Sequence, residues 1–376
     1  MKSILFVIGS LDRGGAEIQL SRLAIALKQN GINVHIFTLS LGGDLTGNLL
    51  ENGATISHGY LNYGTNFISR VLLIFISWVK LIFICIKSKP CIIHGFLPLG
   101  NFLASTSAFI ARVKCVTSKR ALGTHQDINS LWRYIDNMSN YLSNVVTANS
   151  LGVVNDALLR ERFLKDKIKL VYNGIDLDNY SDLLVKREKN RQILKLSNRE
   201  IAIICIANLI PYKGHNDLLL AFSYLSKRFP NIKLFLAGDD RGIQEKLTHK
   251  AKELSIENKI IFCGIVNDIP ELLSAMDIGV LTSHEEGFSN AIMEYLSAGL
   301  PVVATNVGGN EEILLNAPGC YLCRVKDIEG ISSNLAKAAN ELDSNPSDRT
   351  LRIKLIKDNY SVDNMFTNYL KIYYRL

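Results

Sequence analysis

Residues 284–294 have the types and spacing needed to hold a phosphorylated ligand. Ser289 is a suitable N-cap for a helix expected over residues 290–298. The free N–H groups at such a helix start can bind phosphate. Glu286 precedes that start and Glu294 lies one turn inside the helix. Only one of the two carboxylates can stabilise the helix dipole as a cap, so we expect the other to contact hydroxyl groups of a sugar or a ribose.

Lys213 is a second candidate, in the sequence Pro-Tyr-Lys-Gly-His at 211–215. It follows an apolar run at 201–206 that is typical of a buried strand. The lysine is therefore expected at the carboxyl end of a strand, where α/β sheets bind ligands. Its ammonium group can act there as a point charge on a diphosphate.

Gly14 and Gly15 lie where an expected strand passes into an expected helix. Paired glycines let a ligand approach the backbone, and the N–H groups at the helix start can face an anion. An ordinary glycine turn has the same appearance. The spacing is not the G-x-G-x-x-G of dinucleotide-binding proteins, which disfavours a nicotinamide-dependent oxidoreductase.

The elements around these motifs predict an α/β protein with two doubly wound sheets. A turn is expected at 171–176, between a first and a second set of elements. In the first set, strands are expected at 4–8, 34–39 and 91–96, with a helix at 16–29. In the second set, strands are expected at 201–206, 233–237, 260–262, 278–281 and 302–305, with helices at 216–228 and 244–254.

The composition agrees with two globular domains in 376 residues. The whole excess of +7 lies in the first half: residues 1–180 hold 18 basic and 11 acidic residues, whereas residues 181–376 hold 24 of each. This imbalance indicates a first domain that faces a phosphate-bearing acceptor or an acidic membrane surface. A solvated basic face is the plain alternative.

The cysteines and the first residues indicate a cytoplasmic protein. Seven cysteines, mostly inside apolar runs, are typical of buried thiols in a reducing compartment. Cys320 and Cys323 form a lone C-x2-C pair with no second pair or nearby histidine, so no metal site is predicted. The chain enters a strand directly after Met-Lys-Ser, so no cleavable signal peptide is expected.

Residues 67–86 form an almost unbroken apolar stretch of about bilayer-spanning length. Arg70 and Lys80 interrupt it and disfavour a spanning helix. Two interpretations remain open: a buried core helix, or an interfacial helix that places Trp78, Phe75 and Phe83 in lipid.

Taken in order, five motifs resemble glycosyltransferase family 4 and together span nearly the whole chain. They are Gly-Gly-Ala-Glu at 14–17, Val-Tyr-Asn-Gly-Ile-Asp at 171–176, Pro-x-Lys-Gly at 211–214, the pattern E-G-F-x-N-x-x-x-E at 286–294, and A-G-L-P-V-V-A-T-x-V-G-G at 298–309.

The resemblance implies a GT-B architecture, with two Rossmann-like, doubly wound domains that face each other across a cleft. The acceptor-binding domain would comprise residues 1–172 together with a C-terminal helix at about 357–376. The donor-binding domain would comprise residues 173–356.

The resemblance also implies roles for particular residues. Lys213 would bind the donor diphosphate, Glu286 the transferred sugar and Glu294 the ribose. Lys213 and Glu286, with His125 in the first domain, are the candidate catalytic residues. The full set of candidate donor-binding residues is Gly14, Gly15, Asn208, Lys213, Glu286, Gly287, Phe288, Ser289, Asn290 and Glu294.

Two departures from the family pattern affect these roles. Asn208 stands where the family usually has an arginine, which lowers the positive charge available to the diphosphate. The family's first-domain histidine also has no clear counterpart here, because both His125 and His94 fit. Arg120, Lys119 and His94 are the acceptor-side candidates. Arg120, Lys119 or a residue outside the motif could compensate for Asn208.

The resemblance implies a retaining hexosyltransferase that needs no metal and no cofactor. It would move a sugar from a nucleotide diphosphate sugar of UDP or GDP type to a lipid-linked or glycan acceptor, in capsule, O-antigen or lipopolysaccharide synthesis. It would work in the cytoplasm, peripherally at the inner face of an anionic membrane, without nucleic acid. The alternatives are an inactive scaffold that binds nucleotide sugar and a sugar-nucleotide epimerase of the same fold. The sugar, base, linkage and oligomeric state are not encoded in any motif.

Overall fold

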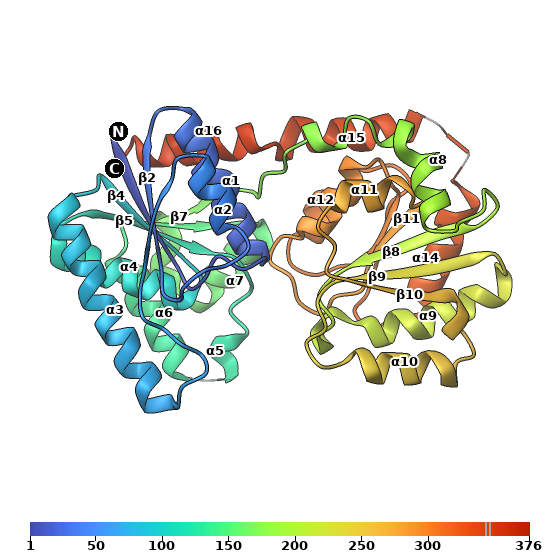
Figure 1. The fold of residues 1–376 in the computed structure, drawn as a ribbon, viewed down its shortest axis with the longest axis horizontal. Helices are drawn as coiled ribbons and strands as arrows, with labels where there is room; N and C mark the ends of the chain where they lie inside the picture. The colour runs from blue at the N-terminus through green and yellow to red at the C-terminus, as the bar shows by residue number, and fades with distance from the viewer. Residues whose placement is uncertain (129, 343, 346) are drawn as a thin grey trace. The chain divides into compact units, whose positions relative to one another are not determined.

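The computed structural model describes residues 1–128, 130–342, 344–345 and 347–376, apart from the side chains of His125 and Ile128. The chain forms two compact units. The first comprises Met1–Gly174 and Val362–Leu376, and the second comprises Ile175–Ser361. Figure 1 labels the elements of each unit, which are described separately below.

The first unit is built on a seven-stranded sheet of order β3-β2-β1-β4-β5-β6-β7, in which neighbouring strands pair in parallel. The strands are β1 (Ser3–Ile8), β2 (Asn33–Thr38), β3 (Thr55–His58), β4 (Ile92–Phe96), β5 (Lys114–Lys119), β6 (Val145–Ala148) and β7 (Ile168–Leu170). The helices are α1 (Gly15–Gln29), α2 (Thr46–Glu51), α3 (Phe67–Ser88), α4 (Pro98–Ala111), α5 (His125–Ile128), α6 (Ser130–Leu142), α7 (Leu151–Arg160), the short η1 (Arg162–Asp166) and α16 (Val362–Tyr373). The strand order reverses at β1 and β4, as expected of a doubly wound sheet.

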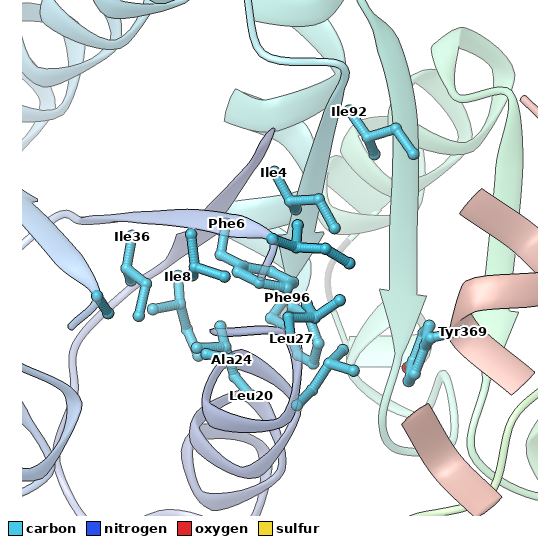
Figure 2. Packing of buried hydrophobic residues seen from close by; sticks show 14 of the residues in the cluster. Ile4, Phe6, Ile8, Leu20, Ala24, Leu27, Ile36, Ile92, Phe96 and Tyr369 are labelled. Carbon is cyan, nitrogen blue, oxygen red and sulfur yellow. The ribbon is translucent and has the colours of Figure 1, made fainter. Parts of the chain in front are cut away.

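Strand β1 is covered on both faces, which explains its continuous apolar sequence. Its side chains alternate between two core clusters. Ile4, Phe6 and Ile8 pack with α1 and with Tyr369 of α16, as Figure 2 shows. Leu5 belongs to the other cluster, with residues of α3 and α4.

Helix α3 departs from the expectation of a buried core helix. Only Ser77, Leu81 and Cys85 are buried along its 22 residues, because only this one line of the helix packs on the unit. Trp78 lies on the flank of this line, where its Nε1 donates a hydrogen bond to Thr106 Oγ1 of α4 at 3.0 Å. The core interpretation is therefore wrong, and so is the placement of Trp78 on an outer apolar face.

The second unit contains a six-stranded parallel sheet of order β10-β9-β8-β11-β12-β13. The strands are β8 (Ile201–Ile206), β9 (Ile232–Ala237), β10 (Ile260–Gly264), β11 (Ile278–Leu281), β12 (Val302–Thr305) and β13 (Tyr321–Cys323). The helices are α8 (Leu183–Ile193), α9 (His215–Arg228), α10 (Gln244–Glu253), α11 (Ile269–Ser274), α12 (Asn290–Ser297), α13 (Asn310–Leu314), α14 (Ile328–Asn340) and α15 (Ser347–Tyr360), with short η2 (Asp178–Tyr180), η3 (Pro211–Lys213) and η4 (Glu257–Lys259). Two doubly wound sheets, one in each unit, confirm the predicted fold class.

The chain passes between the units twice, at 174–175 and at 361–362. In the first unit, the side-chain amide of Gln19 donates to the carbonyl of Gly174 at 3.0 Å and accepts from its N–H at 2.8 Å. In the second unit, the N–H of Ile175 donates to the carbonyl of Tyr360 at 2.9 Å. The crossing at 174–175 is thus held by the Gln19 side chain in the first unit and by a backbone hydrogen bond in the second unit.

Candidate active site

The strand order of the second sheet reverses between β8 and β11, which lie side by side. Loops that leave the carboxyl ends of two such strands run in opposite directions and open a crevice that binds ligands. The loop after β8 carries Lys213, and the loop after β11 carries Glu286. The two strongest candidates from the sequence therefore lie on the two sides of one switch point.

The turn that presents Lys213 is held tightly against the loop after β11. Residues 211–213 form the 3-10 turn η3, and Gly214 follows at φ +71°, a conformation that favours glycine. A Cβ atom at Gly214 would collide with the carbonyl oxygen of Thr282. The Thr282 hydroxyl donates to the Gly214 carbonyl at 3.0 Å. This position needs glycine for close approach of the backbone as well as for its dihedral angle.

Lys213 and Glu286 are in direct contact. The Lys213 Nζ lies 2.7 Å from Glu286 Oε1, and the Ser283 hydroxyl donates to the same oxygen at 2.7 Å. The lysine side chain is 18% exposed and the glutamate side chain 11%. In this partly buried setting, the carboxylate offsets the charge of a lysine that would otherwise need an anion. The pair can open toward a ligand that brings its own phosphate and hydroxyl groups.

Helix α12 begins at Asn290, three residues after Gly287. Ser289 is its N-cap and accepts from the N–H of Ile292 at 3.3 Å, as predicted. Glu294 lies in the second turn and is partly exposed. The backbone ahead of the helix is held by the N–H of Gly309, which donates to the Gly287 carbonyl at 2.8 Å. The helix start is thus fixed at the edge of the sheet where an anion can approach it.

Two further contacts brace the loops and were not expected from the sequence. His284 Nε2 lies 2.7 Å from Asp217 Oδ2 in the first turn of α9. The N–H of His284 donates to the carbonyl of Tyr212 at 2.7 Å. These contacts join the Lys213 turn to the Glu286 loop from the side, and no local pattern links residues 67 positions apart.

Asn208 has a structural role at this edge. Its Oδ1 accepts from the N–H of Asp239 at 3.1 Å and so ties the β8 loop to the end of β9. The next loop supplies a cation that sequence reasoning missed, because Arg241 lies outside the family motifs. The Arg241 side chain pairs with Asp239 at 2.8 Å, and the backbone N–H of Arg241 donates to the Leu209 carbonyl at 3.3 Å. A positive charge therefore lies close to Asn208, on the neighbouring strand end.

His215 begins α9 beside Lys213 and is almost fully buried, with 1% exposure. Neither ring nitrogen has a hydrogen bond of ordinary geometry in the described part of the chain, although the backbone of Ala207 and of Ile210 lies within reach of the ring. Burial, together with the nearby charge of Lys213, lowers the pKa of His215 to about 4, and these backbone groups oppose the effect. The folded protein therefore holds this ring neutral at pH values where an unfolded histidine is protonated.

This histidine should make the second unit sensitive to acid. Because its folded pKa lies below the unfolded value, stability is lost as pH falls from about 6.5 toward 4. Between pH 7.5 and 5 the loss amounts to about 2 kcal/mol. We expect His215→Phe to show a smaller drop in urea midpoint between these pH values than the parent. His249→Phe, at an exposed site on α10, should behave as the parent does, and an equal drop in all three proteins would contradict the assignment.

In the first unit, Gly14 and Gly15 lie at the start of α1, as expected. Glu17 folds back onto this helix start, so that a Cβ atom at Gly14 would collide with its carboxylate. Burial raises the pKa of Glu17, and the nearby Asp12 raises the pKa further. The protein's own carboxylate thus occupies the position that the dipole of α1 offers to an anion.

Among the acceptor-side candidates, Arg120 contacts both a polar and an aromatic side chain. Its Nη2 donates to Asn173 Oδ1 at 2.6 Å, and its guanidinium lies 5.7 Å from the centre of the Phe96 ring. Its buried Nε has no hydrogen bond of ordinary geometry among the described residues, although Tyr369 lies within reach of the guanidinium. Burial lowers the pKa of Arg120, and Tyr369 and, to a lesser extent, Glu17 oppose this effect. A desolvated cation suits an anionic ligand.

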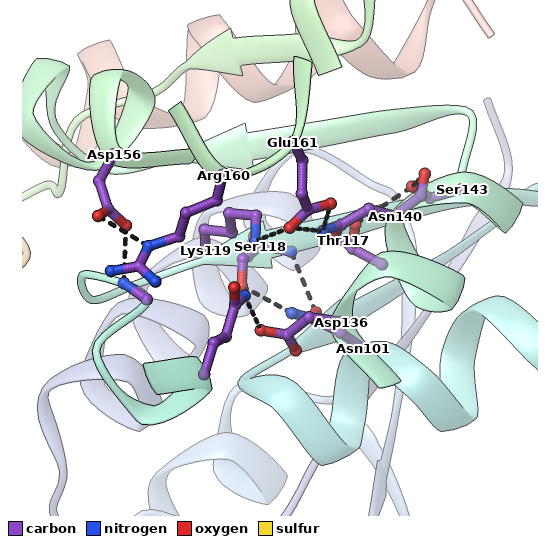
Figure 3. Close-up of polar contacts among 12 residues, drawn as sticks. Asn101, Thr117, Ser118, Lys119, Asp136, Asn140, Ser143, Asp156, Arg160 and Glu161 are labelled. Carbon is purple, nitrogen blue, oxygen red and sulfur yellow. Dashed lines mark hydrogen bonds and ion pairs between the residues drawn. The ribbon is translucent and has the colours of Figure 1, made fainter. Parts of the chain in front are cut away.

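Lys119 is used within the first unit. Its Nζ lies 3.2 Å from Glu161 Oε1, and Asn140 donates to both oxygens of that carboxylate, as Figure 3 shows. The Lys119 side chain is 13% exposed and that of Glu161 is 1%. The lysine therefore offsets a buried charge between β5 and the end of α7.

His94 is fully buried, and both of its ring nitrogens are hydrogen bonded. Nδ1 lies 2.7 Å from the Tyr373 hydroxyl and Nε2 lies 2.8 Å from the Ser118 hydroxyl. Burial lowers the pKa of His94 well below its usual value. The neutral ring joins β4, β5 and α16. His125 begins α5, but its side chain lies outside the described residues.

Comparison with known proteins finds two family models, one for each half of the chain. The family model described as Glycosyltransferase Family 4 matches residues 13–179, and the model described as Glycosyl transferases group 1 matches residues 186–351. The chain has the GT-B fold, and it belongs to the family 4 glycosyltransferases.

Its relatives include enzymes of surface-polysaccharide synthesis. An N-acetyl-alpha-D-glucosaminyl L-malate synthase of Bacillus anthracis is 29% identical over 70% of this chain and 68% of that protein. A UDP-Gal:alpha-D-GlcNAc-diphosphoundecaprenol alpha-1,3-galactosyltransferase of Escherichia coli is 26% identical over half of each chain. The capsular polysaccharide biosynthesis glycosyltransferase CapM of Staphylococcus aureus is 22% identical over 70% of this chain and 71% of that protein.

A solved structure shows the same fold over the whole chain. The Anabaena protein HepE in complex with UDP and glucose superposes with a TM-score of 0.87, at 20% identity, over all of both chains. At this identity the likeness concerns the fold.

Proposed function

We propose that this glycosyltransferase is a metal-independent, retaining hexosyltransferase that uses a UDP- or GDP-type sugar. The observation that carries the proposal is the Lys213–Glu286 pair at the sheet switch point, just before the start of α12. A lysine and the N–H groups of a helix start supply positive charge for a diphosphate, and a carboxylate accepts hydrogen bonds from sugar hydroxyls. The nucleotide named for the Escherichia coli relative and found in HepE supports a UDP-type donor.

In the proposed reaction, the bond from the anomeric carbon to the diphosphate breaks as the acceptor oxygen bonds to the same face of the sugar. The acceptor proton passes to the departing phosphate oxygen. Lys213 and the start of α12 stabilise the charge that develops on the diphosphate, which removes the need for a divalent cation. Glu286 holds the sugar so that its anomeric carbon faces the acceptor. Arg120, in the first unit, is proposed to bind an anionic group of the acceptor.

The proposed acceptor is a lipid-linked or glycan acceptor of bacterial capsule, O-antigen or lipopolysaccharide synthesis, met at the inner face of the cytoplasmic membrane. Two relatives support this pathway, one by the diphosphoundecaprenol in its name and one by its capsular role. The basic first half of the chain supports an anionic partner. The relative from Bacillus anthracis is named for L-malate, so a small soluble acceptor is the competing candidate.

The stereochemical claim is tested with the donor alone. Purified protein is incubated in EDTA with UDP-glucose, UDP-galactose, UDP-N-acetylglucosamine or GDP-mannose, and the sugar first released to water is followed by proton NMR. The proposal predicts that one donor is consumed and that its sugar appears first as the α-anomer. Release of the β-anomer first would refute retention, and turnover only with added magnesium would refute metal independence.

A further inference from the structure

Helix α3 presents an unusually apolar outer face. Nine large apolar residues along its length are exposed, including Ile68 at 80%, Phe75 at 54% and Phe83 at 64%. The complete set is Phe67, Ile68, Val71, Leu72, Phe75, Ile76, Val79, Phe83 and Ile86. Exposed apolar surface that continues over 22 residues, about 33 Å of helix, marks an interaction site rather than ordinary surface.

The two charges within α3 do not interrupt this face. The Arg70 guanidinium donates to the carbonyls of Thr65 and Tyr63 at 2.9 and 2.7 Å, and so folds back on the preceding loop. The Lys80 ammonium donates to the His58 carbonyl at 2.7 Å. Lys80 is therefore held toward the protein, whereas Arg70 is exposed but bonded to the loop that precedes the helix. From residue 71 to residue 86, every exposed side chain of α3 is apolar.

A cluster of cations follows the apolar face at the C-terminal ends of α3 and α4. Ile86 and Ile110 line one side of a shallow, open hollow of about 360 Å³, and Lys89, Arg112 and Lys114 line it as well. These three basic residues and Lys87 are exposed, and none of the four forms an ion pair in the part of the chain that the structure describes. We refer to Lys87, Lys89, Arg112 and Lys114 as the basic rim.

The sequence around this surface contains no acidic residue. From residue 52 to residue 126 there is no aspartate or glutamate, whereas eight lysines and arginines occur. An apolar stripe beside a cationic rim, without nearby negative charge, is complementary to an anionic bilayer: the stripe suits the acyl boundary and the rim suits lipid phosphates. A protein partner gives no reason for such a long exclusion of acidic residues.

A spanning arrangement is ruled out by packing. Ser77, Leu81 and Cys85 are buried against the core cluster that contains Leu5 and Leu103, so one side of α3 is already covered by protein. A spanning helix would have to leave this core cluster, so α3 in its place on the unit lies in the membrane plane rather than across it.

We propose that the outer face of α3 and the basic rim form the surface that docks this protein on an anionic phospholipid bilayer. This inference rests on the proposed function in one respect: a lipid-linked acceptor would be reached at the membrane surface. In the docked state, α3 lies parallel to the bilayer with Ile68, Phe75 and Phe83 among the acyl chains. The basic rim contacts the phosphates.

The test is sedimentation of the full chain with vesicles of phosphatidylcholine, with and without 30 mol% phosphatidylglycerol, in the absence of any donor. The parent is expected to bind the anionic vesicles at least about 100-fold more tightly than the neutral ones. Two variants should each bind the anionic vesicles at least about 100-fold more weakly. One is Ile68→Ser/Leu72→Ser/Phe75→Ser/Phe83→Ser, and the other is Lys87→Gln/Lys89→Gln/Arg112→Gln/Lys114→Gln.

Matched controls come from the second unit. Leu184→Ser/Val185→Ser removes exposed apolar residues of α8, and Lys186→Gln/Lys189→Gln/Lys246→Gln/Lys252→Gln removes four exposed lysines. Both should bind vesicles as the parent does. Stabilisation by a nucleotide diphosphate is measured on each variant separately, so that a failure of docking is distinguished from a failure of the donor site.

A fluorescence change that appears only on membrane binding gives a test that does not depend on loss of binding, which a misfolded variant would also show. Phe75→Trp in a Trp78→Phe/Trp132→Phe background should show a blue shift with anionic vesicles and quenching by brominated lipid. No shift at this position would overturn the proposal, as would parent-like binding by either α3 or rim variant. A dimer that the α3 variant converts to a monomer, with vesicle binding unchanged, would instead assign the face to a second copy of the chain.

Discussion

Lys213→Met is expected to lower kcat for sugar transfer by about 10²- to 10³-fold, the range typical of losing one preorganised charge at a developing negative charge. Lys213 is held at the carboxyl end of β8 by the tight Gly214 turn, beside the start of α12. Methionine keeps most of the side-chain volume and removes the charge. The measurement is donor consumption at saturating donor.

The matched control for this substitution is Lys233→Met. Lys233 lies on β9 in the same unit, and its ammonium group pairs with the carboxylate of Glu200 at 3.1 Å. Its kcat should stay within about twofold of the parent, because the residue lies outside the switch-point loops. A kcat for Lys213→Met within a factor of about five of the parent would remove the lysine from the reaction.

Glu286→Gln is expected to separate nucleotide binding from sugar transfer. The amide cannot hold the transferred sugar as the carboxylate does, so kcat/KM should fall by about 10²-fold or more. Lys213, however, loses the partner that it contacts at 2.7 Å. Because a phosphate no longer competes with that carboxylate, the nucleotide diphosphate without sugar should bind as tightly as to the parent or up to about fivefold more tightly.

The comparison needs calorimetric titration with the nucleotide diphosphate, alongside kinetics with the nucleotide sugar. Glu285→Gln, at the exposed neighbouring position, serves as the control and should leave both quantities close to those of the parent. Equal weakening of nucleotide binding and transfer by Glu286→Gln would show that Glu286 holds the nucleotide instead of the sugar.

The arrangement of the donor loops was predictable because it depends on local signals. Short apolar runs gave β8 and β11 with correct bounds, and Ser289 gave the start of α12. In a parallel sheet the carboxyl ends of all strands lie at one edge, so both loops were expected at that edge. That β8 and β11 are neighbours is a finding of the structure. What the residues did not predict is that Lys213 and Glu286 contact each other, since their separation of 73 positions carries no periodic signal.

Helix α3 shows the limit of hydrophobicity as a guide. Its sequence is apolar on every side, so composition alone does not tell which line faces the protein. Ser77 lies on the buried line because α3 packs closely there on the segment around Gly59 and Tyr60. Leu81 and Cys85 continue this line into the core cluster. The larger apolar residues are left outside.

Single polar residues were equally hard to assign. His94 lies within β4 and Lys119 ends β5, yet each is used within the first unit. The histidine contacts the hydroxyls of Tyr373 and Ser118, and the lysine contacts the carboxylate of Glu161. These partners come from other parts of the chain. Only the tertiary fold shows whether such a residue is already used.

The central claim is that the switch point of the second sheet binds a nucleotide diphosphate through Lys213. Its most direct test is thermal unfolding of the parent and of Lys213→Met in EDTA, with UDP, GDP, CDP, ADP or NAD. The account predicts that one diphosphate stabilises the parent, by about 2.7 kcal/mol at a ligand concentration 100 times its Kd, and leaves Lys213→Met almost unchanged. Stabilisation by NAD alone, or equal stabilisation of both proteins by a diphosphate, would contradict it.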